Sequence, residues 1–175
     1  MLGLSVMTAC SPPLKPLVAI TMRDGQPTLV LVTCRGAFSQ VTAFRNGGPS
    51  GSSSPDPAAL VDWQTWGDAP SEIVEAAIFG DPPTGWETEY GDETDPSVIS
   101  AERPTRLEPG VPYSATGHSS YDDGHYIDFT ADDLARLESG MVMTTDEDGA
   151  PATMTYDDFI AQALEYRRPC KPVQE

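Results

Sequence analysis

The chain has 175 residues, of which 39% are hydrophobic, and its 17 prolines and 15 glycines predict one folded domain with many turns. Asp and Glu number 27 against 10 Lys and Arg, giving a formal net charge of −17. This charge excludes nucleic acid as a partner, because phosphate backbones are repelled, and favours cationic, neutral or metal-ion partners. No stretch approaches the roughly 18 apolar residues of a membrane-spanning helix.

The first residues carry a pattern for lipid attachment. Met7-Thr8-Ala9-Cys10 resembles a bacterial lipobox, in which small residues precede a cysteine that is lipidated. No Lys or Arg precedes this run, which departs from the basic start of a secretory signal. We expect 1–9 to be a signal-peptide remnant, 10–16 a lipidated proline-rich tether and 17–175 a single β-rich domain. An unmodified cysteine in an ordinary N-terminus is the alternative.

Three cysteines occur in the chain, and their number supports this reading. If Cys10 carries lipid, Cys34 and Cys170 remain as a pair outside the cytoplasm, where disulfides persist. That bond would enclose nearly the whole domain and contribute roughly 4–5 kcal/mol by the chain-entropy model. Two buried free thiols are the alternative. We therefore expect a lipid-anchored protein on the extracytoplasmic face of the cell membrane.

The first predicted element of the domain is a β-hairpin over 17–34, in which Asp24-Gly25 suits the positive φ angles of a tight turn. Both faces of its second arm are apolar, so we expect it inside a sheet with Cys34 pointing inward. Alternation predicts the next strands at 39–45 and 60–66, separated by a Gly- and Ser-rich loop. Residues 71–79 fit a helix face or a strand, and the flanking Pro and Gly favour a strand.

Shorter segments follow, and we expect extended structure at 86–90, 98–100, 105–107, 111–116 and 125–129, with an acidic loop at 91–96 and a polar loop at 118–124. Capping patterns at Thr130 and Thr155 predict a short helix to Leu137 and a longer one over 156–166, with a strand at 141–144 between them. The pattern predicts a mainly β fold: a β-sandwich of short strands with one or two short helices near the C-terminus.

Several features resemble the small lipoproteins of high-GC Gram-positive (actinobacterial) bacteria. They are the MTAC segment ending at Cys10, the PLVAI opening of the first strand, the LEPGVPYSATG strand entry and a capped C-terminal helix that closes on a cysteine. Eight arginines against two lysines agree with the coding bias of such genomes. The resemblance implies a location in the cell envelope and a β-rich fold, and it implies no activity.

Two classes of function remain open. A non-catalytic domain that binds a cationic protein, peptide or envelope polymer would use exposed aromatics and acids, namely Trp63, Trp66, Tyr121, Asp122 and Asp123. Burial in the sandwich core is the alternative for the tryptophans. A metal-dependent or hydrolytic envelope enzyme would instead use His118, His125 and Asp128, because two imidazoles and a carboxylate can bind Zn²⁺.

The sequence favours the binding domain. The two histidines are seven positions apart, which matches no established metal motif. There is no G-x-S-x-G segment, no phosphate-binding loop and no dinucleotide fingerprint. We therefore expect no cofactor, and a membrane contact through the lipid on Cys10.

Overall fold

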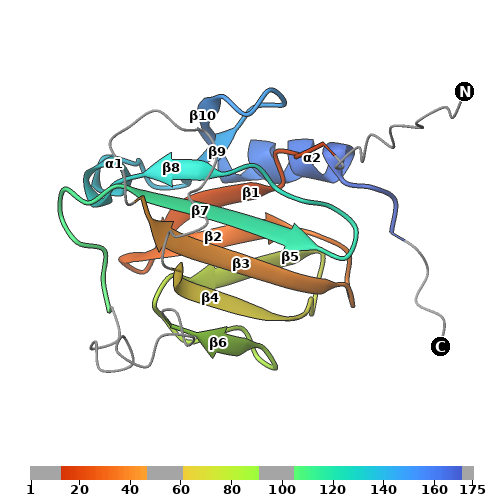
Figure 1. The fold of residues 1–175 in the computed structure, drawn as a ribbon. Helices are drawn as coiled ribbons and strands as arrows, with labels where there is room; N and C mark the ends of the chain where they lie inside the picture. Colours follow the sequence, from red (N-terminus) through yellow and green to blue (C-terminus); the bar gives the residue numbers. More distant parts are fainter. Residues whose placement is uncertain (1–12, 47–60, 91–104, 171–175) are drawn as a thin grey trace, which may run out of the picture.

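A computed structural model describes residues 13–46, 61–90 and 105–170. The predictions for Cys10, the loop at 91–96 and the segment at 98–100 lie outside these residues. The elements, in chain order, are β1 (Val18–Arg23), β2 (Gln26–Val32), β3 (Phe38–Arg45), β4 (Val61–Asp68), β5 (Ile73–Ala77), β6 (Glu87–Glu89), β7 (Tyr113–Ser119), β8 (Ile127–Phe129), α1 (Ala131–Ala135), β9 (Met141–Thr145), β10 (Pro151–Thr155) and α2 (Tyr156–Tyr166) (Figure 1).

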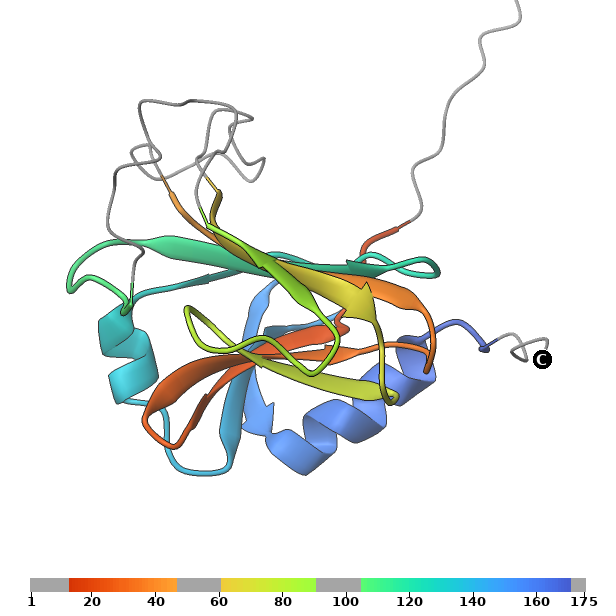
Figure 2. The same ribbon diagram turned by 90° about the horizontal axis from the view of Figure 1, so that it is seen from below.

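The strands form two antiparallel sheets of five, which confirms the predicted β-sandwich. One sheet has the order β10-β9-β1-β2-β5 and the other has the order β6-β4-β3-β7-β8. Figure 2 shows the two sheets as stacked layers, with α2 on the far side of the first. We call the first sheet the covered sheet and the second the open sheet.

The predicted hairpin is the centre of the covered sheet. Asp24 and Gly25 have φ angles of 50° and 80°, so the dipeptide makes the expected turn between β1 and β2. Leu29 and Leu31 of β2 point between the sheets, whereas Val30 and Val32 point toward α2. The second arm is apolar on both faces because each face has its own hydrophobic layer to join.

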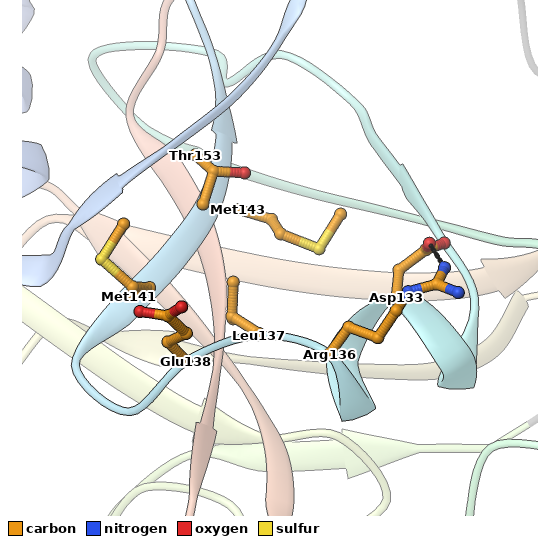
Figure 3. A pocket seen from close by; sticks show the side chains of 7 residues that line it. All are labelled: Asp133, Arg136, Leu137, Glu138, Met141, Met143 and Thr153. Atoms are coloured by element: carbon orange, nitrogen blue, oxygen red, sulfur yellow. Dashed lines mark hydrogen bonds and ion pairs between the residues drawn. The ribbon is translucent and has the colours of Figure 1, made fainter.

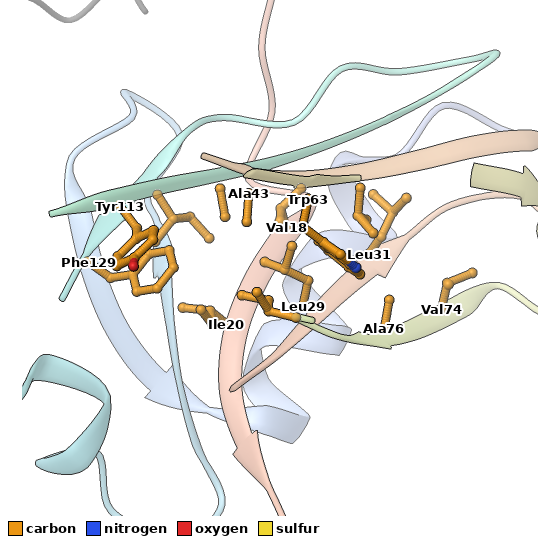
Figure 4. Close-up of a cluster of buried hydrophobic side chains, with 14 of the residues drawn as sticks. Val18, Ile20, Leu29, Leu31, Ala43, Trp63, Val74, Ala76, Tyr113 and Phe129 are labelled. Carbon is orange, nitrogen blue, oxygen red and sulfur yellow. The ribbon is translucent and has the colours of Figure 1, made fainter. Parts of the chain in front are cut away.

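The larger hydrophobic layer lies between the two sheets (Figure 4). Its side chains are nearly free of solvent contact and come from both sheets, among them Val18, Ile20, Leu29, Leu31, Ala43, Trp63, Val74, Ala76, Tyr113 and Phe129. The rings of Tyr113 and Phe129 stack with centroids 5.8 Å apart. Burial of this apolar surface is the main stabilising term of the sandwich.

The smaller layer lies under α2. Thr155 caps this helix by accepting a hydrogen bond from the backbone N–H of Asp158, as the sequence predicts. Phe159 and Ala163 are buried against the covered sheet, and Ile160 packs beside them. Leu164, which the pattern also placed on the packed side, is 36% exposed. The helix therefore contacts the sheet through a narrower stripe than the sequence predicts.

The ambiguous segment at 71–79 contains the strand β5, as the sequence favours. Other elements differ from the predictions. Residues 105–107 form no strand, and Leu107 instead joins the core from a loop. Strand β7 continues to Ser119, so His118 lies on a strand and not in the predicted loop, because pairing with β3 persists to Ser39↔Ser119. No helix in the described part of the chain is long and apolar enough to cross a membrane.

The predicted cysteine pair is joined. The Sγ atoms of Cys34 and Cys170 lie 2.10 Å apart, across a sequence separation of 136. Cys34 is buried, as expected from the face it shares with Val30 and Val32. The bond fixes the chain after α2 to the end of β2.

Candidate functional site

The candidate site is the outer face of the open sheet. No described helix or strand packs over it, whereas α2 lies over the other outer face (Figure 2). Its middle carries polar and aromatic side chains from three adjacent strands, β4, β3 and β7. The register places Trp66 beside Gln40, and Gln40 beside His118, in one row across the sheet.

Three of these side chains form a hydrogen-bonded row with Glu89 of β6. His118 Nε2 lies 3.1 Å from Gln40 Oε1, and Gln40 Nε2 donates to Gln64 Oε1 over 2.7 Å. Gln64 Nε2 donates in turn to a carboxylate oxygen of Glu89. We call His118, Gln40, Gln64 and Glu89 the amide row. It joins β7, β3, β4 and β6 through side chains on the outer face of the sheet.

The carboxylate fixes the direction of every bond in the amide row. An ionised Glu89 only accepts, so Gln64 presents its amide nitrogen to Glu89 and its oxygen to Gln40. Gln40 then presents its own oxygen to His118, so the imidazole donates from Nε2. The row is consequently polarised toward Glu89. Such a connected row holds its side chains in fixed positions.

The outer face also carries a one-signed charge. Asp68, Glu87, Glu89 and Asp128 occupy outward positions, and none of the outward positions described on the five strands holds Lys or Arg. Trp66 is partly exposed in this field and lies opposite Glu87 on β6. An indole ring beside carboxylates attracts a cationic side chain both through its π face and by direct ion pairing.

Two of the predicted contact residues are buried and cannot contact a partner at the surface. Trp63 is fully buried, because its side chain points from β4 into the layer between the sheets, and the prediction that it is an exposed contact was wrong. Asp122 is also buried, with its side chain only 3% exposed, because Lys15 and Arg168 bind it. Tyr121 and Asp123 are half-buried in the same turn. Of the two predicted tryptophans, only Trp66 reaches the surface.

The proposed metal ligands are not brought together. His118 belongs to the amide row, and His125 packs against the turn at Gly149. Asp128 accepts hydrogen bonds from Ser114 and Asn46 on the outer face of the open sheet. No group of three His, Cys, Asp or Glu side chains able to hold a metal occurs within the described ranges. The three-residue metal site was therefore wrong: β7 carries His118 away from the other two.

A shallow pocket lies beside α1 (Figure 3). In Figure 2, α1 and the C-terminal end of α2, which leads to Cys170, lie at opposite ends of the sandwich. Its volume is about 440 Å³, and it is lined by Asp133, Arg136, Leu137, Glu138, Met141, Met143 and Thr153. The carboxylate of Asp133 already has partners within the fold, because it accepts from Thr130 in the capping box of α1 and pairs with Arg136 at 2.7 Å. Hydrogen bonds from Thr130, and then from Arg136, lower the pKa of Asp133.

Comparisons of the chain with protein-family models, with curated proteins and with solved structures found no match. The site has to be interpreted from its own chemistry. The amide row was missed in the sequence because its members lie on four strands. The available signal was the position of Gln40, Gln64 and His118 on the polar side of segments in which polar and apolar residues alternate.

Proposed function

We propose that this protein is a lipid-anchored domain on the extracytoplasmic face of the cell membrane, where it binds a cationic partner without catalysis. The outer face of the open sheet is the binding surface. The observation that carries this proposal is the combination of Trp66, the amide row and four carboxylates on a face without a described Lys or Arg. The partner is a protein, peptide or envelope polymer with exposed positive charge.

The compartment is supported by the cysteines. A disulfide between Cys34 and Cys170 suits an oxidising environment outside the cytoplasm. With these two paired, Cys10 is the one remaining cysteine of the sequence, and it stands at the end of the lipobox-like segment. Two or three acyl chains on such a cysteine are enough for a stable membrane anchor.

The chemistry of the face favours lysine and arginine side chains. A guanidinium or ammonium group over the ring of Trp66 would lie close to Glu87, on the neighbouring strand. Gln40 and Gln64 are already hydrogen-bonded to each other, so they remain in place, and the free lone pairs of their amide oxygens can accept from backbone N–H groups of a partner. The fixed row reduces the ordering cost of binding.

Binding to a short peptide rich in lysine and arginine tests the proposal. We expect the peptide to bind the purified protein at moderate salt, and the Trp66→Ala and Glu87→Gln variants to weaken binding about tenfold each. Isothermal titration calorimetry gives the affinities, and circular dichroism checks that each variant is folded.

A matched control separates this face from the general acidity of the chain. Asp132→Asn on α1 changes the net charge by the same amount as Glu87→Gln, but it lies near the pocket at the other side of the molecule. We expect Asp132→Asn to leave the affinity unchanged. Equal weakening by the two variants, or full affinity after Trp66→Ala, would reject the open sheet as the binding surface.

A further inference from the structure

Both ends of the described chain emerge at one end of the sandwich, the right-hand end in Figures 1 and 2. We define the chain-end pole by the five segments that meet there, which are 14–17, 33–38, 68–72, 119–124 and 167–170. We propose that the chain-end pole lies against the membrane surface and that the pocket end points away from it. This inference rests on the lipid anchor of the proposed function.

Direct contacts hold the segments of the pole together. The backbone N–H of Lys15 donates to Asp123 at 3.0 Å, and its ammonium group binds the buried carboxylate of Asp122 at 2.7 Å. Arg168 binds the same carboxylate through its backbone N–H and its side chain. The disulfide then ties Cys170 to the end of β2. The first and last described residues are therefore fixed to the same end of the fold.

Close packing at Gly124 keeps the N-terminal segment in this position. Lys15 forms a bridge with Gly124, and a Cβ atom at Gly124 would lie 2.4 Å from Val18 and 2.7 Å from the carbonyl of Gly117. Only a glycine fits here without displacing the side chain of Val18 or the backbone of Gly117. The chain thus enters the domain along a defined path and does not swing freely at Lys15.

The remaining link to the anchor is short. Cys10 precedes Leu14 by four positions, and four residues span at most about 14 Å even when fully extended. A domain of about 160 residues has a radius of gyration of roughly 15 Å. A lipid on Cys10 would therefore hold the chain-end pole within about one domain radius of the bilayer. The tether is too short for the domain to turn over and place its pocket end against the bilayer instead.

The surface of the pole suits contact with lipid head groups. Leu14 and Phe38 are 40% and 47% exposed, and they are two of the four large hydrophobic side chains that are exposed in the described chain. Its five segments hold four basic residues (Lys15, Arg35, Arg167, Arg168) and four acidic residues (Asp68, Glu72, Asp122, Asp123), so its formal charge is zero. The excess negative charge of the protein lies elsewhere, which removes the main repulsion between this pole and an anionic membrane.

Oxidative footprinting on a synthetic anchor tests the orientation. The full chain, with its disulfide intact, is coupled through the Cys10 thiol to a maleimide phospholipid in vesicles of phosphatidylcholine and phosphatidylglycerol. The reference is the same protein capped at Cys10 with N-ethylmaleimide and mixed with the same vesicles. Hydroxyl radicals then label exposed side chains, and mass spectrometry gives the rate at each residue. We expect the rate at Phe38 to fall several-fold on anchoring, and the rates at Met141 and Met143 to stay the same.

A pair of charge reversals sharpens the test. Arg35→Glu gives the pole a net negative charge and is expected to restore much of the reactivity of Phe38 on these vesicles. Arg136→Glu makes the same change of charge at the pocket end and is expected to leave the protection intact. Both arginines are exposed, so both variants should fold.

Two outcomes would overturn the orientation: Phe38 as reactive on the anchor as in the capped protein, or protection of Met141 and Met143 in its place. The anchor is supplied chemically, so neither outcome depends on lipidation in cells.

Lipidation itself is tested by mass spectrometry of the protein extracted from native membranes, where a lipid adduct is expected on a fragment that begins at Cys10. An unmodified fragment would reject the anchor of the proposed function and leave the footprinting result standing.

Discussion

The two outer faces of this sandwich differ in what covers them, although each belongs to an antiparallel sheet of five strands. The covered sheet presents Val30 and Val32 to Phe159 and Ala163 of α2, and the layer between them excludes water. The open sheet presents Gln40, Gln64 and other polar groups, and it keeps them in order with hydrogen bonds. The first face stabilises the fold through burial. The second face carries polar side chains that stay in contact with water, and it is the face that we propose for recognition.

The covered face should be the more sensitive of the two. Replacing both cysteines, Cys34→Ser with Cys170→Ser, should lower the free energy of unfolding by about 4–5 kcal/mol, because the open chain regains the entropy of a long loop. Urea unfolding at equilibrium measures the change. A loss below about 1 kcal/mol would mean that packing alone holds the chain after α2 to the covered sheet.

Phe159→Ala should cost about 3–5 kcal/mol, because the ring is fully buried and its removal leaves a cavity under α2. Trp66→Ala on the open face is the matched comparison, and it should cost no more than about 1 kcal/mol. Thermal unfolding of the two variants side by side gives both values. Equal costs would contradict the division of the molecule into a stabilising face and a recognition face.

Gln64→Ala interrupts the amide row and should cost only about 1 kcal/mol, because its partners are partly exposed to water. Its specific effect should appear at His118, whose donation from Nε2 depends on the orientation of Gln40. Nitrogen NMR of the imidazole should find the Nε2–H tautomer in the parent and a mixture in the variant. His125, which lies outside the row, should keep its signals.

The smallest effect concerns the edge of the covered sheet at high pH. Burial, and then the hydrogen bond that Tyr156 donates to Glu75, raise the pKa of Tyr156 from 10.0 to about 12. The neutral phenol is therefore favoured by folding. This contribution to stability is complete below pH 10 and is lost as the pH rises through about 12. Between these two pH values, the free energy of unfolding should fall less steeply for Tyr156→Phe than for the parent protein, as measured by urea unfolding at each pH.

Local signals were sufficient for most of the framework. Asp24-Gly25 specified the first hairpin, and the capping patterns at Thr130 and Thr155 specified both helices, because each signal acts within a few residues. The cysteine pair was predicted by setting Cys10 apart on account of its lipobox-like segment. Strand order did not follow, because β1 lies between β2 and β9 and the latter pairing joins Ile20 to Met143. Neither segment carries a local sequence signal that specifies which strand it pairs with.

The tryptophans teach a sharper lesson. Trp63 and Trp66 are three positions apart on one strand, so their side chains point to opposite faces and only one could be exposed. That consequence was available from the sequence. The choice between them was not, because it depends on which face of β4 meets the other sheet. The amide row was beyond reach for the same reason, since its bonds depend on the order of four strands.

The central position of β1 has a consequence for synthesis. Strand β1 has apolar residues on both faces and a neighbouring strand on each side, yet β9 begins at Met141, 118 positions after β1 ends at Arg23. Until then the β1–β2 hairpin keeps an unpaired apolar edge, which can join other chains. We expect a nascent chain that stops before residue 141 to aggregate, so the β1–β2 hairpin depends on β9, late in the chain, to cover its edge.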